Sequence, residues 1–336
     1  MSQVISIELV DMSGFIRTIT PESKGWEGSL WFALRGAGGN NFGVVTKLTF
    51  ALEDAPPKSV YFELYHNTAE DCGHALLTFQ KLGSLPATDP NSLSTLLSGE
   101  LDGIGTWPAF CRLRGIYMGS LNDFNKSLSK YTSRLADNDV YYDPLISFVN
   151  AHDNYLGAIG DMMAEYGGVD GTEFHVRSYG QSLADDGVYS LTLDSAKAFM
   201  HTVAEIQPSN GSFTIQPQFC LSGPASATSR PPRYSNMAFS HTNNIFVSQT
   251  LTMPLPDVGT SGYLDGVGRS KYILNAMKVA AGGSSKQWYG YQNYMDPYIK
   301  DFGRAYYGDN LESLKEIKEL ADPYNILDFP MGLAHA

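Results

Sequence analysis

Residues 34–46 read LRGAGGNNFGVVT, and this glycine-rich segment does most to decide the fold. A short apolar stretch at 29–34 favours a helix, and residues 44–52 then alternate as a strand does. A dinucleotide-binding Rossmann loop has the opposite order, strand first and helix after, so this loop is of a different kind. Its backbone N–H groups suit a phosphate or a carbonyl oxygen of a ligand, although the glycines equally suit a tight turn.

Upstream of this segment the sequence predicts a hairpin. Residues 4–10 and 15–19 alternate on either side of a turn-forming DMSG sequence. Downstream of it, DAPP at 54–57 interrupts the pattern. We therefore expect a first domain over residues 1–54.

Strands and helices interleave beyond these prolines, which predicts an α+β fold with an antiparallel sheet flanked by helices. The expected strands are 59–65, 110–118, 212–221, 244–253 and 287–294, and the expected helices are 68–82, 124–135, 195–206 and 263–280. Residues 139–190 show little periodicity and are expected to be rich in loops. A middle domain over 55–285 and a C-terminal segment over 286–336 follow from this pattern.

The C-terminal segment contains the clearest helical pattern. Asp309 or Asn310 can cap a helix there. Leu311, Leu314 and Ile317 mark its buried face, with Leu320 near it.

The composition narrows the range of functions. The 336 residues are 43% hydrophobic and 17% charged, which allows a large core and two domains. With 35 acidic against 23 basic residues the net charge is -12, which argues against a nucleic-acid groove and a polybasic membrane anchor. No run approaches the ~18 apolar residues that cross a bilayer. We therefore expect no nucleic-acid or membrane partner, and the first residues lack the pattern of a signal peptide.

Neither the cysteines nor the histidines indicate a metal. Cys72, Cys111 and Cys220 form no CxxC pair, so we expect isolated buried thiols. The seven histidines show no HxxxH or HExxH spacing. No metal site is predicted.

A second segment, YGYQNYMDP at 289–297, is rich in tyrosine. Within the expected strand, Tyr289, Tyr291 and Asn293 would share one face, and Tyr294 would lie on the other face or at the strand end. Tyrosine can act as a general base where positive charge or hydrogen bonds stabilise its phenolate. An aromatic strand face packed in a core is the alternative interpretation.

Read together, these segments resemble one enzyme family. The glycine-rich segment is similar to the second flavin-domain motif of the berberine-bridge-enzyme-like FAD oxidases, within the vanillyl-alcohol oxidase (PCMH-type FAD) superfamily. Residues 291–296, YQNYMD, resemble the family's Y-x-N-Y-x-D motif, and FSH at 239–241 resembles its F-P-H stretch. Residues 305–327 resemble its closing segment. The resemblance implies a remnant of a PCMH-type FAD-binding domain over 1–54, a substrate-binding domain over 55–285, and a C-terminal segment that returns to the FAD domain.

The resemblance also implies an activity. The family consists of FAD-linked oxidoreductases in which substrate is oxidised by hydride transfer to flavin and O2 usually serves as acceptor. The main expectation is a small ring-bearing specialised metabolite, such as an alkaloid, as substrate. A saccharide oxidase of the same family is the alternative, and a truncated, inactive remnant or a binding scaffold is a second one.

The same resemblance implies roles for individual residues. Tyr294 would abstract a proton, and Tyr291 and Asn293 would contact the flavin. The residues nearest the family's substrate positions are Tyr289, Ser248 and Gln249. Contacts to FAD, mainly through the backbone, would come from Gly38, Gly39, Asn41, Phe42, Gly43 and Val45.

One family motif has no counterpart in this chain. The R-x-G-G-H-type loop binds the pyrophosphate and often bonds the flavin through its histidine, and a cysteine often makes a second bond. The residues for covalent attachment are thus absent here. We expect the chain alone to hold little flavin, and we expect its other FAD subdomain to be missing or separately encoded.

Overall fold

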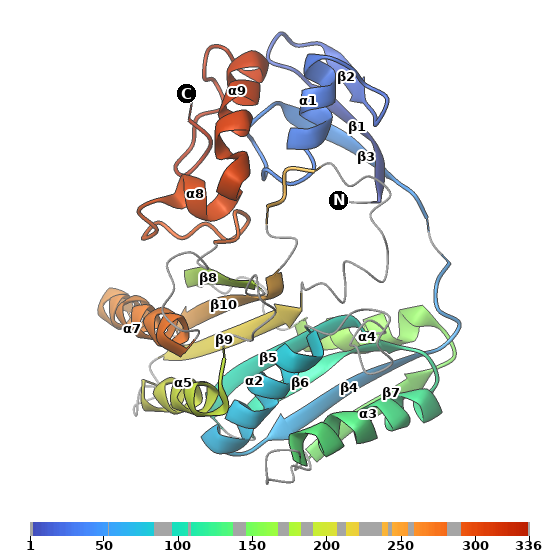
Figure 1. Ribbon diagram of the computed structural model, residues 1–336, viewed down its shortest axis with the longest axis vertical. Coiled ribbons are helices and arrows are strands. Elements are labelled where there is room, and N and C mark those ends of the chain that lie inside the picture. Colours follow the sequence, from blue (N-terminus) through green and yellow to red (C-terminus); the bar gives the residue numbers. More distant parts are fainter. Residues whose placement is uncertain are drawn as a thin grey trace. The chain divides into compact units, whose positions relative to one another are not determined.

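Two compact units make up the computed structural model (Figure 1). The residues that it describes are 3–52, 54–83, 96–106, 109–136, 146–166, 175–182, 191–206, 213–221, 237–240, 244–254, 259–280 and 290–334. Unit 1 contains Met1–Asp54, Arg230–Thr242 and Tyr289–Ala336, and unit 2 contains Ala55–Ser229 and Asn243–Trp288. Helices and antiparallel sheets occur in both units, so the α+β class is confirmed.

The chain leaves unit 1 after Asp54, where the sequence predicts a domain boundary. One stretch is grouped differently from the expectation: residues 230–242 belong to unit 1 rather than to the middle domain. Hydrogen bonds explain the difference. The N–H of Ala238 donates to the Phe32 carbonyl at 3.2 Å, and the Asn310 side-chain amide donates to the Ala238 carbonyl at 3.1 Å.

A three-stranded antiparallel sheet forms one side of unit 1. Its order is β2–β1–β3, with β1 at Val4–Val10, β2 at Ile16–Ile19 and β3 at Val44–Phe50. The predicted hairpin is present between β1 and β2, and Gly14 in its turn has a φ of 83°. The turn needs glycine there because a Cβ is disfavoured at positive φ.

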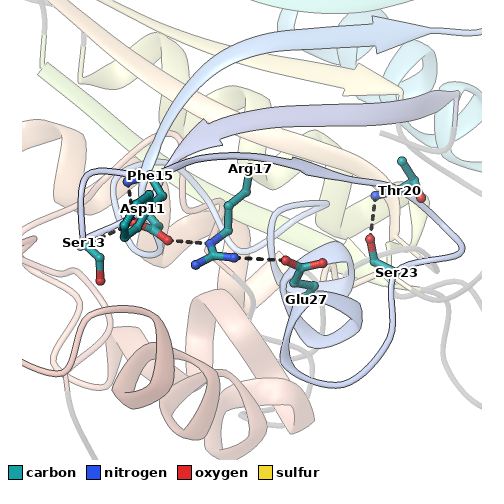
Figure 2. A network of polar contacts seen from close by, with 7 residues as sticks. All are labelled: Asp11, Ser13, Phe15, Arg17, Thr20, Ser23 and Glu27. Atoms are coloured by element: carbon teal, nitrogen blue, oxygen red, sulfur yellow. Dashed lines mark hydrogen bonds and ion pairs between the residues drawn. The ribbon is translucent and has the colours of Figure 1, made fainter.

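Asp11 organises this hairpin (Figure 2). Its carboxylate accepts hydrogen bonds from the backbone N–H groups of Ser13 and Phe15 and from Arg17, which also pairs with Glu27 at 3.3 Å. Burial by itself raises the pKa of Asp11, but these donors outweigh it and hold the pKa below its ordinary value. The network ties the hairpin to the helix that carries Glu27.

Helices complete the core of unit 1. They are α1 (Trp26–Ala33), α8 (Phe302–Tyr307) and α9 (Leu311–Ala321), with a 3-10 turn at Gly308–Asn310. In α9, Leu314 and Ile317 are buried as predicted, but Leu320 is 67% exposed. The position in line with Leu314 two turns later is that of Ala321, which is buried instead.

The cap of α9 also differs from the prediction. Asn310 stands at the N-cap position, but its side chain makes no capping hydrogen bond. Its amide is committed to the Ala238 carbonyl, so a tertiary contact replaces the local one.

Unit 2 is built on a seven-stranded antiparallel sheet of order β7–β4–β6–β5–β9–β10–β8. The strands are β4 (Ser59–His66), β5 (Leu96–Thr106), β6 (Ala109–Met118), β7 (Ile146–His152), β8 (His175–Ser182), β9 (Phe213–Leu221) and β10 (Asn244–Pro254). The helices are α2 (Ala69–Gly83), α3 (Leu121–Ala136), α4 (Tyr155–Tyr166), α5 (Leu193–Glu205) and α7 (Gly259–Ala280).

The expectation that 139–190 is rich in loops is wrong for the described part of that stretch. It contains β7, α4 and β8. Both strands lie at the edges of the sheet, where one side lacks a neighbouring strand, and their sequences mix polar with apolar residues. Such strands carry little of the periodicity that single-sequence reasoning needs.

The two faces of the unit 2 sheet are covered differently. Val60, Phe62 and Leu64 of β4 join the main apolar cluster, which also includes residues of α2, α3, α5 and α7. Helices α2 and α5 pack beside each other over this face (Figure 1). Tyr61 points the other way and packs with Ala158 of α4.

Cys72 and Cys111 form a disulfide, so the expectation of isolated thiols is wrong for these two residues. They stand 39 residues apart in the sequence, on α2 and β6. The packing of the helix on the strand brings their Cα atoms to 5.9 Å, within the range that a disulfide requires. The sequence alone therefore does not identify these two cysteines as a pair.

Candidate functional site

The glycine-rich segment adopts a backbone that other residues cannot follow. Gly36, Gly38 and Gly43 have φ values of 143°, 81° and 147°. A Cβ on Gly36 would lie 2.3 Å from the backbone nitrogen of Phe239, and one on Gly43 would lie 2.8 Å from the Val10 carbonyl oxygen. The tight-turn interpretation is therefore correct as a description of the backbone, and it leaves the ligand interpretation open.

Two of the predicted FAD contacts use their side chains to hold the segment in place. The Asn41 amide donates to the carbonyls of Ala37 and Gly39 at 3.1 and 3.2 Å, and its oxygen accepts from the N–H of Leu333 at 3.0 Å. Phe42 is 1% exposed and lies in the core of unit 1. Any contact of Asn41 or Phe42 with a cofactor is thus left to the backbone.

Gly39 and Val45 are open to a ligand in different ways. A Cβ on Gly39 would meet none of the described residues within 4 Å, so those residues do not cover this part of the backbone. The Val45 side chain, on β3, is 44% exposed. Gly39 and Val45 are thus both accessible among the described residues.

The tyrosine-rich segment forms a turn where a strand is predicted. In the described residues 290–294 the N–H of Tyr294 donates to the Tyr291 carbonyl at 2.9 Å, so the strand prediction is wrong there. A Cβ on Gly290 would lie 2.7 Å from the Tyr306 ring, and the Tyr306 hydroxyl accepts from the N–H of Asp296 at 2.9 Å. These contacts with α8 bend the chain. Tyr289 lies outside the described residues.

The turn brings three predicted site residues together. The Tyr291 and Tyr294 rings meet edge to face with centroids 5.0 Å apart, although strand alternation would separate them. The Asn293 amide donates to the Tyr291 hydroxyl at 2.7 Å. Phe239 adds a further edge contact to Tyr291 at 6.2 Å. We call residues 290–296 the tyrosine turn.

The tyrosine turn lies against the glycine-rich segment. The Gln292 amide nitrogen donates to the Gly36 carbonyl oxygen at 2.6 Å, across 256 residues of sequence. A Cβ on Gly38 would lie 3.2 Å from the Gln292 Cγ. The two motifs that the family resemblance rests on are therefore neighbours in unit 1. Gln292 itself was not among the predicted site residues, because it fills a variable position of the Y-x-N-Y-x-D motif.

The substrate candidates on β10 belong to different rows of the unit 2 sheet. Ser248 pairs with Phe219 and Tyr179, whereas Gln249 pairs with Gln218 and Ser178. Neighbouring residues of a strand lie on opposite faces, so the two cannot serve one surface. The strand register thus distinguishes Ser248 from Gln249, which the sequence alone did not.

Following the rows across the sheet assigns each candidate to a face. The row of Ser248 runs through Leu113 to Leu64, which both lie in the helix-covered cluster. The row of Gln249 runs to Arg112 and Tyr65 on the opposite face. Gln249 is therefore the better placed of the two for a polar ligand.

Charged and phenolic groups gather on this second face. Glu63 accepts hydrogen bonds from the hydroxyls of Tyr61 and Tyr65, and it pairs with Arg112 at 3.2 Å. Burial raises the pKa of Glu63, but the two hydroxyls and the guanidinium together bring it below the ordinary value. The carboxylate is thus held ionised in a nearly buried position.

Two features that would indicate other functions are absent from the described residues. No group of three histidine, cysteine, aspartate or glutamate side chains in that part of the chain is arranged to hold a metal ion. Among the same residues, no helix combines the length and the apolar character that a membrane span requires.

Comparison with known proteins confirms the family resemblance. The family model described as "Berberine and berberine like" matches residues 290–333. The chitooligosaccharide oxidase of Gibberella zeae is 26% identical over 325 residues, covering 93% of this chain and 59% of the relative. The xylooligosaccharide oxidase of Thermothelomyces thermophilus is 26% identical over 327 residues, covering 91% of this chain and 58% of the relative.

A solved structure shows the same fold. The glucooligosaccharide oxidase from Acremonium strictum, described with a 6-S-cysteinyl, 8α-N1-histidyl FAD, matches with a TM-score of 0.79 at 17% identity. The match covers 99% of this chain and 67% of that one. This chain thus spans about three fifths of the length of the curated relatives it matches.

Proposed function

We propose that this chain supplies part of the flavin site and the substrate surface of an FAD-linked oxidoreductase that oxidises a saccharide. The observation that carries the proposal is the contact between the glycine-rich segment and the tyrosine turn through Gln292 and Gly36. Two sequence motifs of one flavoenzyme family, far apart in the chain, share one site. The relatives that cover most of the chain are named as FAD-linked enzymes or oligosaccharide oxidases.

The residues of this site fit a flat, polar-edged ring. Tyr291 and Tyr294 offer partly exposed aromatic surface, and none of the residues that the structure describes would meet a Cβ at Gly39. The Asn293 amide is exposed and can turn toward a ligand. FAD, when bound, would supply the hydride acceptor. No residue for covalent attachment is assigned in this chain.

Within this proposal the chain's own groups have separate tasks. Tyr291 and Asn293, joined by their hydrogen bond, orient the ring, and the glycine-rich segment contributes backbone N–H groups. The Tyr294 phenolic oxygen accepts the proton that leaves the substrate hydroxyl. A tyrosine does this efficiently only where its surroundings favour the phenolate.

A saccharide suits the proposal better than the alkaloid-like substrate that is the main expectation from sequence. The comparisons give oligosaccharide oxidases and do not support an alkaloid substrate. Gln249 lies on the sheet face opposite the main apolar cluster, and its amide has both donor and acceptor atoms, which sugar hydroxyls require. Gln249 is the residue we assign to substrate contact on that face.

Anaerobic reduction of the flavin tests the substrate class. The chain is combined with excess FAD and with the part of the Gibberella zeae relative that it does not cover, supplied as a separate polypeptide. Absorbance near 450 nm is then followed as xylobiose, chitobiose or a benzylisoquinoline alkaloid is added. Bleaching by a disaccharide and none by the alkaloid is the expected result. Bleaching by the alkaloid alone would overturn the saccharide assignment, and Gln249→Leu should weaken only the response to sugar.

One surface of unit 1 supports the proposal of a further FAD subdomain as partner. Five large apolar side chains in and after the edge strand β3 are between 41% and 93% exposed: Val44, Val45, Leu48, Phe50 and Leu52. Exposed apolar edge strands are normally covered. We propose that a missing or separately encoded FAD subdomain covers this strand.

Complementation distinguishes this arrangement from an inactive remnant or a binding scaffold. The part of the Gibberella zeae relative that this chain does not cover can be supplied as a separate polypeptide. Co-purification with the chain and a tighter FAD complex are expected. If the mixture binds FAD no better than the chain alone, the partner proposal fails and the scaffold interpretation gains support.

A further inference from the structure

We propose that Gln292 is a positioning residue that holds the glycine-rich segment and the tyrosine turn in fixed register. The inference deepens the proposed function and rests on it for the identity of the ligand. The bridge itself is a property of this chain. Its test can therefore succeed or fail independently of flavin binding.

The Gln292 side chain fits between two glycines that cannot be replaced without a shift. Its amide nitrogen lies 2.6 Å from the Gly36 carbonyl oxygen, and its Cγ lies 3.2 Å from where a Gly38 Cβ would be. Gly36 also lies close to Phe239, because a Cβ on Gly36 would be 2.3 Å from the Phe239 backbone nitrogen. The side chain is 9% exposed. The glycine-rich segment thus has one defined position relative to residue 292.

Residues of the proposed site lie next to Gln292 in the tyrosine turn, so the position of Gln292 determines theirs. Tyr291 and Asn293 flank Gln292 in sequence and bind each other at 2.7 Å. Tyr294 closes the turn through its N–H to Tyr291. A movement of residue 292 therefore moves both the ring-contacting pair and the proposed base.

The two polar atoms of the Gln292 side-chain amide have different surroundings. The nitrogen makes the bridge, whereas Oε1 is buried and has no hydrogen-bond partner among the residues that the structure describes. Burying an acceptor without a partner is unfavourable, and an apolar side chain of the same shape would avoid it. We therefore infer that glutamine stands at position 292 because its side-chain N–H group donates to Gly36, which an apolar side chain cannot do.

Two substitutions separate the donor from the shape. Gln292→Met keeps the length of the side chain and removes the donor at every pH. Gln292→Glu keeps the shape, but an ionised carboxylate cannot donate to Gly36 and repels its carbonyl. Burial raises the pKa of a carboxyl group, so in mild acid the protonated form regains an O–H that can donate to Gly36. A merely space-filling role would not follow pH in this way.

Gln80→Met is the matched control. The Gln80 amide also binds a backbone, donating to the Leu191 carbonyl at 3.4 Å and accepting from its N–H at 3.3 Å. It is fully buried and belongs to unit 2. The control therefore loses the same kind of bond in the unit that does not contain the site.

Amide hydrogen exchange on the full chain, corrected for intrinsic rates at pH 5 and pH 7.5, provides the test. At pH 7.5, exchange in residues 36–43 and 291–296 should become roughly tenfold faster in Gln292→Met and Gln292→Glu. At pH 5 the glutamate variant should return to the wild-type rate, and the methionine variant should not. Gln80→Met should leave both segments unchanged.

Several results would overturn the inference. The first is an exchange rate in Gln292→Met that equals the wild-type rate. The second is an effect of Gln292→Glu that is the same at pH 5 and pH 7.5. The third is faster exchange in residues 36–43 in Gln80→Met. If Gln292→Met does not fold, the comparison of Gln292→Glu at two pH values still decides within one protein. A parallel FAD titration of the wild type addresses the proposed function alone. Absence of binding there would count against the flavin site but not against the bridge.

Discussion

Replacing Lys318 by methionine should destabilise unit 1 strongly at neutral pH. Lys318 and Asp322 are both fully buried, and their Nζ and Oδ2 atoms lie 2.6 Å apart. Lys318 also donates to the Leu327 carbonyl at 2.9 Å. Removing one member of a buried ion pair costs roughly 3–5 kcal/mol. Because Asp322 keeps the backbone N–H groups of Ile326 and Leu327, we expect the lower end, about 3 kcal/mol.

The pH dependence of this loss has a definite sign. Burial raises the pKa of Asp322, but Lys318 and the two N–H groups outweigh it and hold the pKa below its ordinary value. The wild-type contribution is therefore complete above the unfolded carboxyl pKa of about 4 and is lost as the pH falls through the lower folded value. In Lys318→Met the carboxyl is buried without its cation and protonates more readily. The difference between variant and wild type should thus shrink as the pH falls from 7 to 4.

Urea unfolding followed by circular dichroism measures both effects. Lys315→Met, on the same helix, is the control, because Lys315 makes an exposed ion pair with Glu312 at 3.2 Å. That substitution should change the free energy of unfolding by less than about 0.5 kcal/mol. A loss below about 1 kcal/mol in Lys318→Met, or a loss that does not shrink in acid, would refute the reasoning from the buried pair.

Four further outcomes are expected. Gly36→Ala should lower the free energy of unfolding by roughly 3 kcal/mol, because Gly36 has a positive φ and its Cβ would meet the Phe239 backbone. Gly39→Ala should leave it nearly unchanged, and thermal unfolding compares the two variants. Tyr294→Phe in the complete enzyme should lower turnover strongly with flavin content intact, and unchanged kcat would contradict its assignment as the base. Reduction of the Cys72–Cys111 disulfide should lower the free energy of unfolding of unit 2 by about 2–4 kcal/mol, measured with and without dithiothreitol. The chain purified alone should show little absorbance near 450 nm, and a stoichiometric flavin spectrum would contradict this.

The site was partly predictable, and the residues show why. Glycines at positive φ and a tyrosine-rich segment are local signals, so Gly38 and Gly43 and the pair Tyr291 and Tyr294 could be found from sequence. The turn geometry could not, because residues 290–294 alternate like a strand, and their turn depends on contacts with residues distant in sequence, such as Tyr306. Gln292 could not be found either, since its partner stands 256 residues away.

The fold shows the same division between local and distant effects. Strongly periodic elements, such as β1, β4 and α9, lie where the pattern predicts them. The edge strands β7 and β8 were missed, because a strand with one unpaired edge is under weaker apolar constraint. Leu320 was expected near the buried face of its helix but is exposed, and Asn310, one of two expected caps, binds Ala238 instead.

By itself, the sequence determined the α+β class, the motifs of a flavoenzyme family and the identity of most candidate site residues. These depend on short-range geometry, in which backbone conformation and residue spacing are set by neighbours along the chain. Tertiary structure alone decided the disulfide, the placement of Gln249 and Ser248 in different rows of the sheet and the bridge from Gln292 to Gly36. Each of these joins residues that are distant in sequence, and only the packing of sheets, helices and turns sets the distances between them.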